Sequence, residues 1–275
     1  MKIIRKLLWV IFCIIVFIFV YNISLSIKTS SITGTGANSI TSQKVPMIKV
    51  RKYGRIARDT LSVSYVTNEG EVDTREIIIC WPESAEGDVP LIYVPHYAME
   101  ENTEEFLQYM DHGWAVASPV FEEKYNGQLT GNDLVFNNAA LYVLRHLEGI
   151  DKQRIAIVGD FAGGYMALML SELQMGTCAT IANSPIANVY FNLYVHFKNC
   201  DDVNRKAGLF DVPVPIQLLV SKSFRINLDN FPDVSDADRW AALSPIGNAR
   251  CFSNPTVINH CTGDILAPVD QITKR

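Results

Sequence analysis

Residues 154–170, RIAIVGDFAGGYMALML, decide the fold of this chain. Four apolar residues at 155–158, three of them β-branched, lead into Gly159. After Gly163 and Gly164 comes an apolar segment rich in helix formers. This order predicts a buried strand, a tight turn and a helix. Glycines around such a turn leave room for the strand and the helix to approach each other closely.

The predicted turn has the spacing of a nucleophile elbow. In that motif, G-x-S-x-G, two glycines flank a catalytic residue on a strained turn between a strand and a helix. Here Gly159 and Gly163 flank Phe161. A phenyl ring cannot attack a carbonyl group and cannot be activated by a base. The stretch therefore predicts the backbone of an elbow without its nucleophile.

Two alternatives stay open at this turn. Asp160 carries a carboxylate, which can act as a nucleophile. Centring the turn on Asp160 would put Val158 at a flanking position, where its bulk disfavours the close approach that the motif needs. The second alternative is an ordinary strand-to-helix connection, because G-x-x-x-G alone is a weak signal.

Composition limits the class of protein. The chain has 275 residues, of which 48% are hydrophobic and 19% charged, enough for one large α/β domain with a substantial core. Its formal net charge of −5 gives no basic field that would indicate a nucleic-acid partner. The six cysteines form no C-x-x-C pair and are typical of small buried residues, with a Cys251–Cys261 disulfide open only outside the cytoplasm.

The N-terminus predicts a membrane anchor. Three basic residues occur within residues 1–6, and residues 7–21 are all apolar or aromatic. At about 1.5 Å per residue, about 20 residues cross the hydrocarbon layer of a membrane. We expect residues 1–28 to form a single-pass span with the N-terminus inside and the domain extracytoplasmic. Ser24-Leu25-Ser26 loosely resembles a cleavage site, so a secreted protein is the alternative.

A polar segment separates this anchor from the domain. Residues 29–43, TSSITGTGANSITSQ, have the composition of a flexible linker. The domain is expected over residues 44–275. Six basic residues without an acidic one occur over residues 44–58, and they favour either a solvated face or a contact with anionic lipid or another polyanion.

Strand and helix patterns alternate through the domain. Residues 61–66 and 75–81 are predicted to form a hairpin through residues 68–70. Further strands are expected at 90–95, 113–118, 178–182 and 255–261, and helices at 101–112, 132–149 and 237–249 with a turn at Ser244-Pro245. Such alternation predicts a mostly parallel, doubly wound sheet with helices on both faces. Residues 183–238 are less regular, and they form either a cap over the ligand-binding edge of the sheet or ordinary helices and loops.

The ordered set of segments resembles the α/β-hydrolase fold, and within it the prolyl oligopeptidase-type serine peptidases and esterases. The matching segments are PLIYVPHYA, DHGWAVASP, RIAIVGDFAGGYMALML, ALSPIGNA and PTVINHCTGDILAPVDQ, which occur in the family order over most of residues 53–275. This resemblance implies hydrolysis of ester or peptide bonds by a nucleophile, a histidine and an acid.

The resemblance assigns several positions. It puts Asp264 at the position of the acid and Phe161 at that of the nucleophile. Asp264 is also a common residue type for a turn after glycine. The backbone N–H of Ala162 and a donor from His96 or Tyr97 are the candidates for the oxyanion hole. Gly159, Asp160, Gly163 and Gly164 complete the elbow.

The departures from the family pattern argue against catalysis. Phe161 replaces the nucleophile, and all five histidines precede Asp264, which lies eleven residues before Arg275. Relatives continue through another strand to the catalytic histidine, so the sheet is expected to be C-terminally incomplete. Losing the nucleophile of such a triad removes a factor on the order of 10⁶ in turnover.

No cofactor is expected. The chain lacks a dinucleotide fingerprint, a P-loop lysine and an H-E-x-x-H motif, and the spacing of His260, Cys261 and Asp264 matches no recognised metal-ligand pattern. We therefore expect a membrane-anchored α/β-hydrolase homologue without catalysis, at most binding a small apolar ligand or peptide beside Phe161. An active hydrolase using Asp160 and a histidine outside the chain is the alternative, and a degraded product without a stable fold is a third.

Overall fold

The structure is a computed structural model that describes residues 43–50, 54–82, 87–101, 103–120, 122, 129–173, 176–195, 221–226, 237–264 and 266–273. The chain divides into two compact units, Met1–Ser39 and Ile40–Arg275, and every described residue belongs to the second. The predicted anchor, most of the predicted linker and most of the predicted cap lie outside the described residues. Within the described ranges, no helix is both long enough and apolar enough to cross a membrane.

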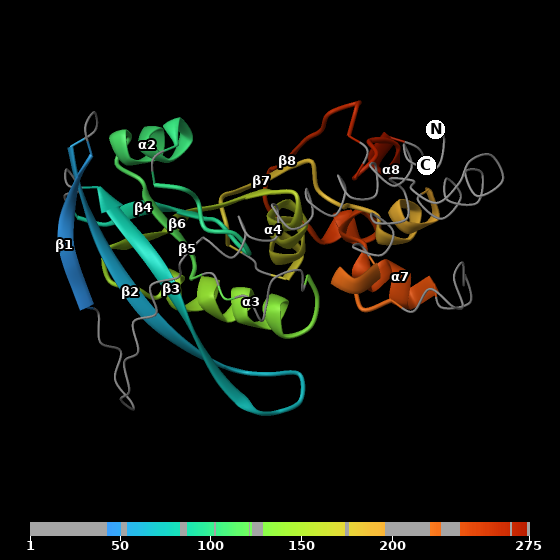
Figure 1. The fold of residues 1–275 in the computed structure, drawn as a ribbon, viewed down its shortest axis with the longest axis horizontal. Helices are drawn as coiled ribbons and strands as arrows, with labels where there is room; N and C mark the ends of the chain where they lie inside the picture. The colour runs from blue at the N-terminus through green and yellow to red at the C-terminus, as the bar shows by residue number, and fades with distance from the viewer. Residues whose placement is uncertain are drawn as a thin grey trace, which may run out of the picture. The chain divides into compact units, whose positions relative to one another are not determined.

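An eight-stranded sheet forms the centre of the Ile40–Arg275 unit (Figure 1). The spatial order of its strands is β1-β2-β3-β5-β4-β6-β7-β8. Strands β1 to β3 pair with their neighbours in antiparallel fashion, and so do β3 and β5. The pairs β4–β5, β4–β6, β6–β7 and β7–β8 are parallel. The strands are β1 (Gln43–Val50), β2 (Gly54–Val66), β3 (Val72–Pro82), β4 (Val89–Tyr93), β5 (Ala115–Pro119), β6 (Ile150–Asp160), β7 (Ala179–Asn183) and β8 (Thr256–Asn259).

The predicted hairpin is present and longer than expected. β2 and β3 pair continuously from Val66 opposite Val72 to Ile56 opposite Pro82. Gly70, with φ of 84°, donates its N–H to the Thr67 carbonyl at 2.9 Å and closes the turn. A positive φ is accessible to glycine without a steric penalty, which explains why the sequence has glycine there.

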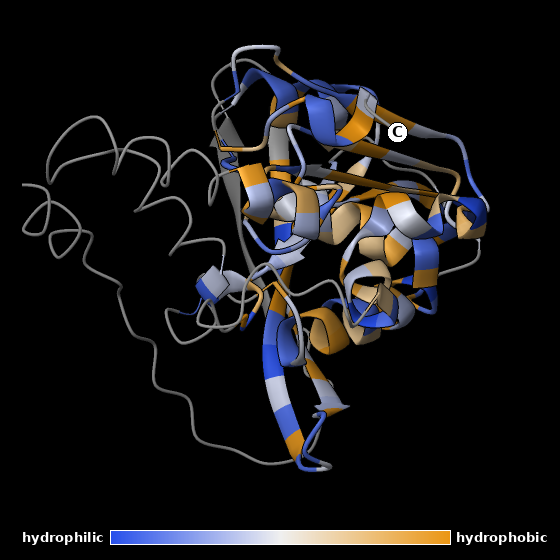
Figure 2. Cartoon of the chain, turned by 90° about the vertical axis from the view of Figure 1, so that its right-hand side faces the viewer, coloured by the Kyte–Doolittle hydropathy of each residue, from blue (hydrophilic) through white to orange (hydrophobic). Residues whose placement is uncertain are grey.

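Helices cover both faces of the sheet, as the alternation predicts. The helices whose two ends are described are α2 (Glu104–Asp111), α3 (Asn132–Arg145), α4 (Ala162–Leu173), α7 (Ala237–Leu243) and α8 (Asp270–Thr273), with the 3₁₀-helix η3 (Pro245–Cys251) after α7. The helix expected over 132–149 ends at Arg145, because His146 forms its C-cap and Gly149 has φ of 86°. In Figure 2 the helices carry hydrophilic and hydrophobic residues on the same ribbon, as helices between a sheet and solvent should.

The central strands are apolar on both faces because each face is covered. On β6, Ile155 and Ile157 join the cluster that contains residues of α3 and α4. The alternate residues Ala156 and Val158 pack with residues of α2, among them Phe106. Successive side chains of a strand point to opposite faces, so an uninterrupted apolar run is what a doubly covered strand requires. This packing fixes the strand that leads into the turn at Phe161.

Candidate functional site

The turn between β6 and α4 has the strained backbone of an elbow. Phe161 stands between the last residue of β6 and the first of α4, with φ of 56°. Its N–H donates to the Asn183 carbonyl at 2.8 Å, and its own carbonyl accepts from the Tyr165 N–H at 2.9 Å. The ring is 36% exposed. Positive φ is uncommon for a bulky residue, so the surrounding structure imposes it.

Close packing requires the glycines that flank the turn. A Cβ atom on Gly159 would lie 2.2 Å from the carbonyl oxygen of Gly163. One on Gly163 would lie 2.9 Å from the carbonyl oxygen of Pro95, and one on Gly164 would lie 3.0 Å from that of Gly159. These neighbours are backbone atoms, which cannot move aside as a flexible side chain can. A residue larger than glycine at position 159 or 163 would therefore collide with the backbone of a neighbouring segment.

A ladder of polar side chains crosses the carboxyl ends of three strands. Asp160, Asn183 and Asn259 are partners in the register of β6, β7 and β8. Asn183 Nδ2 donates to Asp160 Oδ1 at 2.7 Å, and Asn259 Nδ2 donates to Asn183 Oδ1 at 2.8 Å. Asp160 is exposed at the end of this ladder. Its carboxylate is thus an acceptor for an amide, and it has no histidine partner in the described part of the chain.

The loop after β4 lies against the same turn. His96 has φ of 70°, and the Tyr97 N–H donates to the Pro95 carbonyl at 2.9 Å, which makes a strained γ-turn centred on His96. The His96 N–H donates to Asn137 Oδ1 at 3.4 Å. Both backbone donors of this loop therefore already have acceptors within the protein. Ala162 is different, because its N–H belongs to the first turn of α4, which a helix leaves without an intrahelical acceptor.

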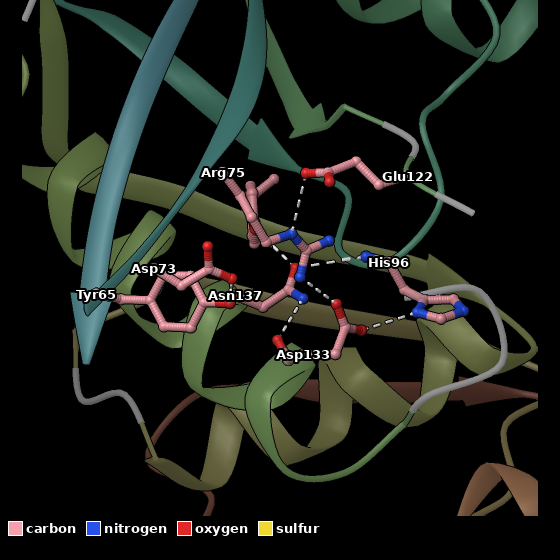
Figure 3. A network of polar contacts seen from close by, with 8 residues as sticks. Tyr65, Asp73, Arg75, His96, Glu122, Asp133 and Asn137 are labelled. Atoms are coloured by element: carbon pink, nitrogen blue, oxygen red, sulfur yellow. Dashed lines mark hydrogen bonds and ion pairs between the residues drawn. The ribbon is translucent and has the colours of Figure 1, made fainter. Parts of the chain in front are cut away.

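A buried charge network holds this loop (Figure 3). Asp133, near the start of α3, accepts from Arg75 Nη1 at 2.7 Å through one oxygen and lies 3.0 Å from His96 Nδ1 through the other. Their side chains are 1% to 4% exposed. Arg75 also lies 3.7 Å from a carboxylate oxygen of Glu122, and its guanidinium carbon is 3.9 Å from the centre of the Phe136 ring. Neighbouring charges and the aromatic face together compensate the burial of the arginine.

Two neutral side chains complete the network. The Tyr93 hydroxyl donates to Asn137 Oδ1 at 2.8 Å, and Asn137 Nδ2 donates to the Asp133 carbonyl at 2.8 Å. Burial, followed by the charge of Asp133, raises the pKa of Tyr93 well above its usual value, so its proton remains available for donation. His96 Nε2 is buried and has no hydrogen-bond partner among the described residues. The network thus ties β3, β4 and α3 to the γ-turn beside Phe161.

The loop that carries Asp264 uses the carboxylate for its own backbone. Asp264 Oδ1 accepts from the N–H groups of Leu266 at 2.9 Å and Ala267 at 3.0 Å. In the described ranges no hydrogen bond joins Asp264 to a histidine. His260 Nδ1 lies 3.3 Å from the Cys261 carbonyl, and no three His, Cys, Asp or Glu side chains in these ranges are arranged to hold a metal ion.

Sequence reasoning identified the turn and its glycines but missed the charge network. Asp133 is a buried acid with two partners, Arg75 and His96. Arg75 lies 58 residues before it and His96 lies 37 before it, so no local pattern connects them. No signal along the chain marked Arg75 as buried, because its neighbours Thr74 and Glu76 are polar and typical of an exposed strand end.

The strand order and the turn define the class of fold, that of the α/β hydrolases of the prolyl oligopeptidase-like type. Among solved structures, an acylaminoacyl peptidase in complex with Z-Gly-Gly-Phe-chloromethyl ketone is similar, with a TM-score of 0.56, 17% identity, and 78% of this chain and 34% of that one covered. Prolyl oligopeptidase B from Galerina marginata is similar with a TM-score of 0.55 and 17% identity, and the match covers 78% of this chain and 30% of that one. Acetyl xylan esterase from Paenibacillus sp. R4 is similar with a TM-score of 0.55 and 16% identity, and the match covers 84% of this chain and 76% of that one.

These similarities concern the fold. The chain spans about a third of the length of the two peptidases and about three quarters of that of the esterase. No family model matches the sequence, and no curated protein matches it.

Proposed function

We propose that this domain is a hydrolase-fold protein without covalent catalysis that binds a small apolar ligand or a peptide at the carboxyl ends of its strands. One observation carries the proposal. Phe161 has the backbone conformation of the catalytic residue of an elbow, yet it presents a partly exposed phenyl ring there. The ring offers an apolar surface where relatives of this fold place a reacting atom.

The neighbouring residues support a non-catalytic role. The position proposed for the acid, Asp264, accepts two backbone N–H groups and no histidine in the described ranges. The N–H groups of His96 and Tyr97 are occupied, which leaves Ala162 as the oxyanion donor among the proposed positions. A phenyl ring at the nucleophile position therefore favours ligand binding over acyl transfer at this edge of the sheet.

The ligand class follows from the exposed aromatic rings. Tyr97 is 42% exposed, and its ring lies 3.9 Å from where a Cβ of Gly163 would be, so it stands beside the turn. Phe161 and Tyr97 therefore offer apolar surface from two loops, next to the polar ladder that ends at Asp160. An acylated peptide with an aromatic side chain matches this combination, because it has both apolar groups and amides.

Binding of the peptide Z-Gly-Gly-Phe tests this proposal. Truncating Phe161 to alanine should weaken the Kd by about 10-fold or more, since burial of an aromatic side chain contributes about 1.5–3 kcal/mol. The matched control is Tyr142→Ala, because Tyr142 is an aromatic residue that is 59% exposed on α3. Equal affinity in the two variants, or no binding by the unaltered domain, would contradict the proposal.

An active hydrolase that uses Asp160 is the second candidate, and the exposure of Asp160 at the strand end favours it. A panel of acyl esters distinguishes the two. Hydrolysis that disappears in Asp160→Asn would support the enzyme, whereas inertness across the panel would support the binding protein. An alkyl fluorophosphonate, which labels activated serines, should leave both the unaltered protein and Phe161→Ser unlabelled.

We further propose that residues 1–28 anchor the domain to a membrane, with the domain extracytoplasmic. The support is the apolar run at residues 7–21 with basic residues before it. An anchored binding protein would meet its ligand at the membrane surface.

A further inference from the structure

A second pocket lies away from Phe161. It has a volume of about 310 Å³ and is formed by three parts of the chain: the segment after β7, helix α7, and the corner between α7 and η3. This volume is at the lower end of the range for small-molecule sites, about 300–1,000 Å³. Helix α7, which lines the pocket, lies on the side of the domain that carries β8 rather than β1 (Figure 1).

Aromatic rings form one wall of this pocket. Tyr190 and Trp240 meet edge to face, with ring centres 5.1 Å apart and planes at 72°. Tyr194 does not line the pocket but stacks on Tyr190, with ring centres 6.2 Å apart and ring planes at 12°. Ala237 and Ala241, which line the pocket from α7 together with Trp240, have small side chains and leave the space open. Rings in this arrangement favour another ring against their faces or edges.

Buried hydrogen bonds hold the walls in place. The Ser244 Oγ accepts from the Val189 N–H at 3.0 Å, and the Ile246 N–H donates to the Ala187 carbonyl at 3.1 Å. The side chain of Gln271, which is 2% exposed, accepts from the N–H groups of Ala187 at 2.9 Å and Asn188 at 3.1 Å. These bonds join the segment after β7 to η3 and α8. The pocket is thus formed before a ligand arrives, which reduces the entropic cost of binding.

The polar groups that line the pocket are hydrogen-bond donors. Ser244 Oγ accepts from the backbone, so its hydroxyl hydrogen can still be donated. Asn188 Oδ1 accepts from the Phe191 N–H at 2.9 Å, and its Nδ2 has no acceptor among the described residues. Among the described residues, none of the side chains that line the pocket is charged. The pocket therefore suits a neutral molecule that brings its own acceptor.

We propose that this pocket binds an uncharged aromatic ring bearing a hydrogen-bond acceptor, such as an aryl amide. The ring packs against Tyr190 and Trp240, and the acceptor takes a hydrogen bond from Asn188 or Ser244. This inference uses none of the residues around Phe161 and stands independently of the function proposed for them.

The test uses the full chain labelled with 5-fluorotryptophan and titrated with benzamide. The ¹⁹F resonance that disappears in Trp240→Phe identifies Trp240. Benzamide should shift this resonance saturably, with a Kd on the order of 1 mM for a ligand of its size, and leave those of Trp81 and Trp114 in place. Cyclohexanecarboxamide, which has the acceptor without the aromatic ring, and benzoate, which is charged, should each bind at least about 3-fold more weakly.

A pocket-filling variant provides the second measurement. Ala241→Phe should weaken benzamide binding by about 10-fold or more, whereas Ala242→Phe, an exposed neighbour on α7 that does not line the pocket, should not. Unchanged dispersion of the other tryptophan resonances confirms that each variant folds. Absence of a saturable Trp240 shift, equal binding of cyclohexanecarboxamide, or equal weakening in Ala242→Phe would each overturn the proposal.

Discussion

Phe161 has a backbone angle that its own side chain does not favour. Its φ of 56° has no advantage for a phenyl ring, since the left-handed region costs an L-residue about 1–2 kcal/mol. The angle persists because Gly159, Gly163 and Asn183 fix the turn from both sides. The surrounding backbone, and not the preference of the phenylalanine, therefore sets the φ angle at position 161.

This strain predicts an unusual order of stability at position 161. Phe161→Gly should exceed Phe161→Ala in free energy of unfolding by about 1 kcal/mol, because only alanine keeps the steric penalty of positive φ. The reverse order is expected in a helix, where glycine costs about 1 kcal/mol relative to alanine. Ala139→Gly in α3 is therefore the matched control and should destabilise the domain. Denaturant titration of the variants measures these differences, and an alanine variant as stable as the glycine one would contradict the strain.

At the scale of elements, the charge network connects parts that the sequence separates. Arg75 lies on β3, Asp133 on α3 and His96 in the loop after β4. Substituting any one of these three residues would leave a buried charge or dipole of its partners unpaired. The γ-turn beside Phe161 thus depends on packing between a strand and a helix that flank it.

Removing one partner of this network should destabilise the domain strongly. Asp133→Asn leaves the Arg75 guanidinium buried without its closest anion, and a loss of about 3–5 kcal/mol in free energy of unfolding is expected. The surface pair Arg154–Asp151, with an arginine side chain 55% exposed, serves as control, and Asp151→Asn should change stability by less than about 1 kcal/mol. Similar effects of the two substitutions in thermal and denaturant unfolding would refute the importance of the buried pair.

How much the sequence predicted depends on the range of the interactions. The strand, turn and helix over residues 154–170 follow from apolar runs and glycines that are adjacent in the chain. The pairing of β2 with β3 follows from a short turn at Gly70. The contacts of Asp133 and the hydrogen bond from the His96 N–H to Asn137 join residues dozens of positions apart, and no periodicity encodes them. The pocket at Trp240 was missed for the same reason, because its walls meet only in the folded domain.

At the scale of the whole molecule, the sheet brings two kinds of surface together. The carboxyl ends of β6, β7 and β8 carry a polar ladder beside Phe161, and the packed ends of α7 and η3 enclose an aromatic pocket. Each surface belongs to a binding site that we propose, and the two sites share no residue. Because different residues form the two sites, ligand binding at each site can be measured without altering the other.

The proposed anchor gives the last prediction. The full chain should remain in membranes washed with alkaline carbonate and have an intact mass of 30.8 kDa, because residues 1–28 are retained as a span. A chain that begins at residue 44 should be released by the same wash. Ile14→Lys combined with Phe17→Lys should also be released, since each charge at the centre of a span costs about 2.5–3.5 kcal/mol. Protease added from outside should separate the domain from the anchor at the linker. A lighter species that begins near Ile27 and leaves the membrane without treatment would instead identify residues 1–26 as a cleaved signal peptide.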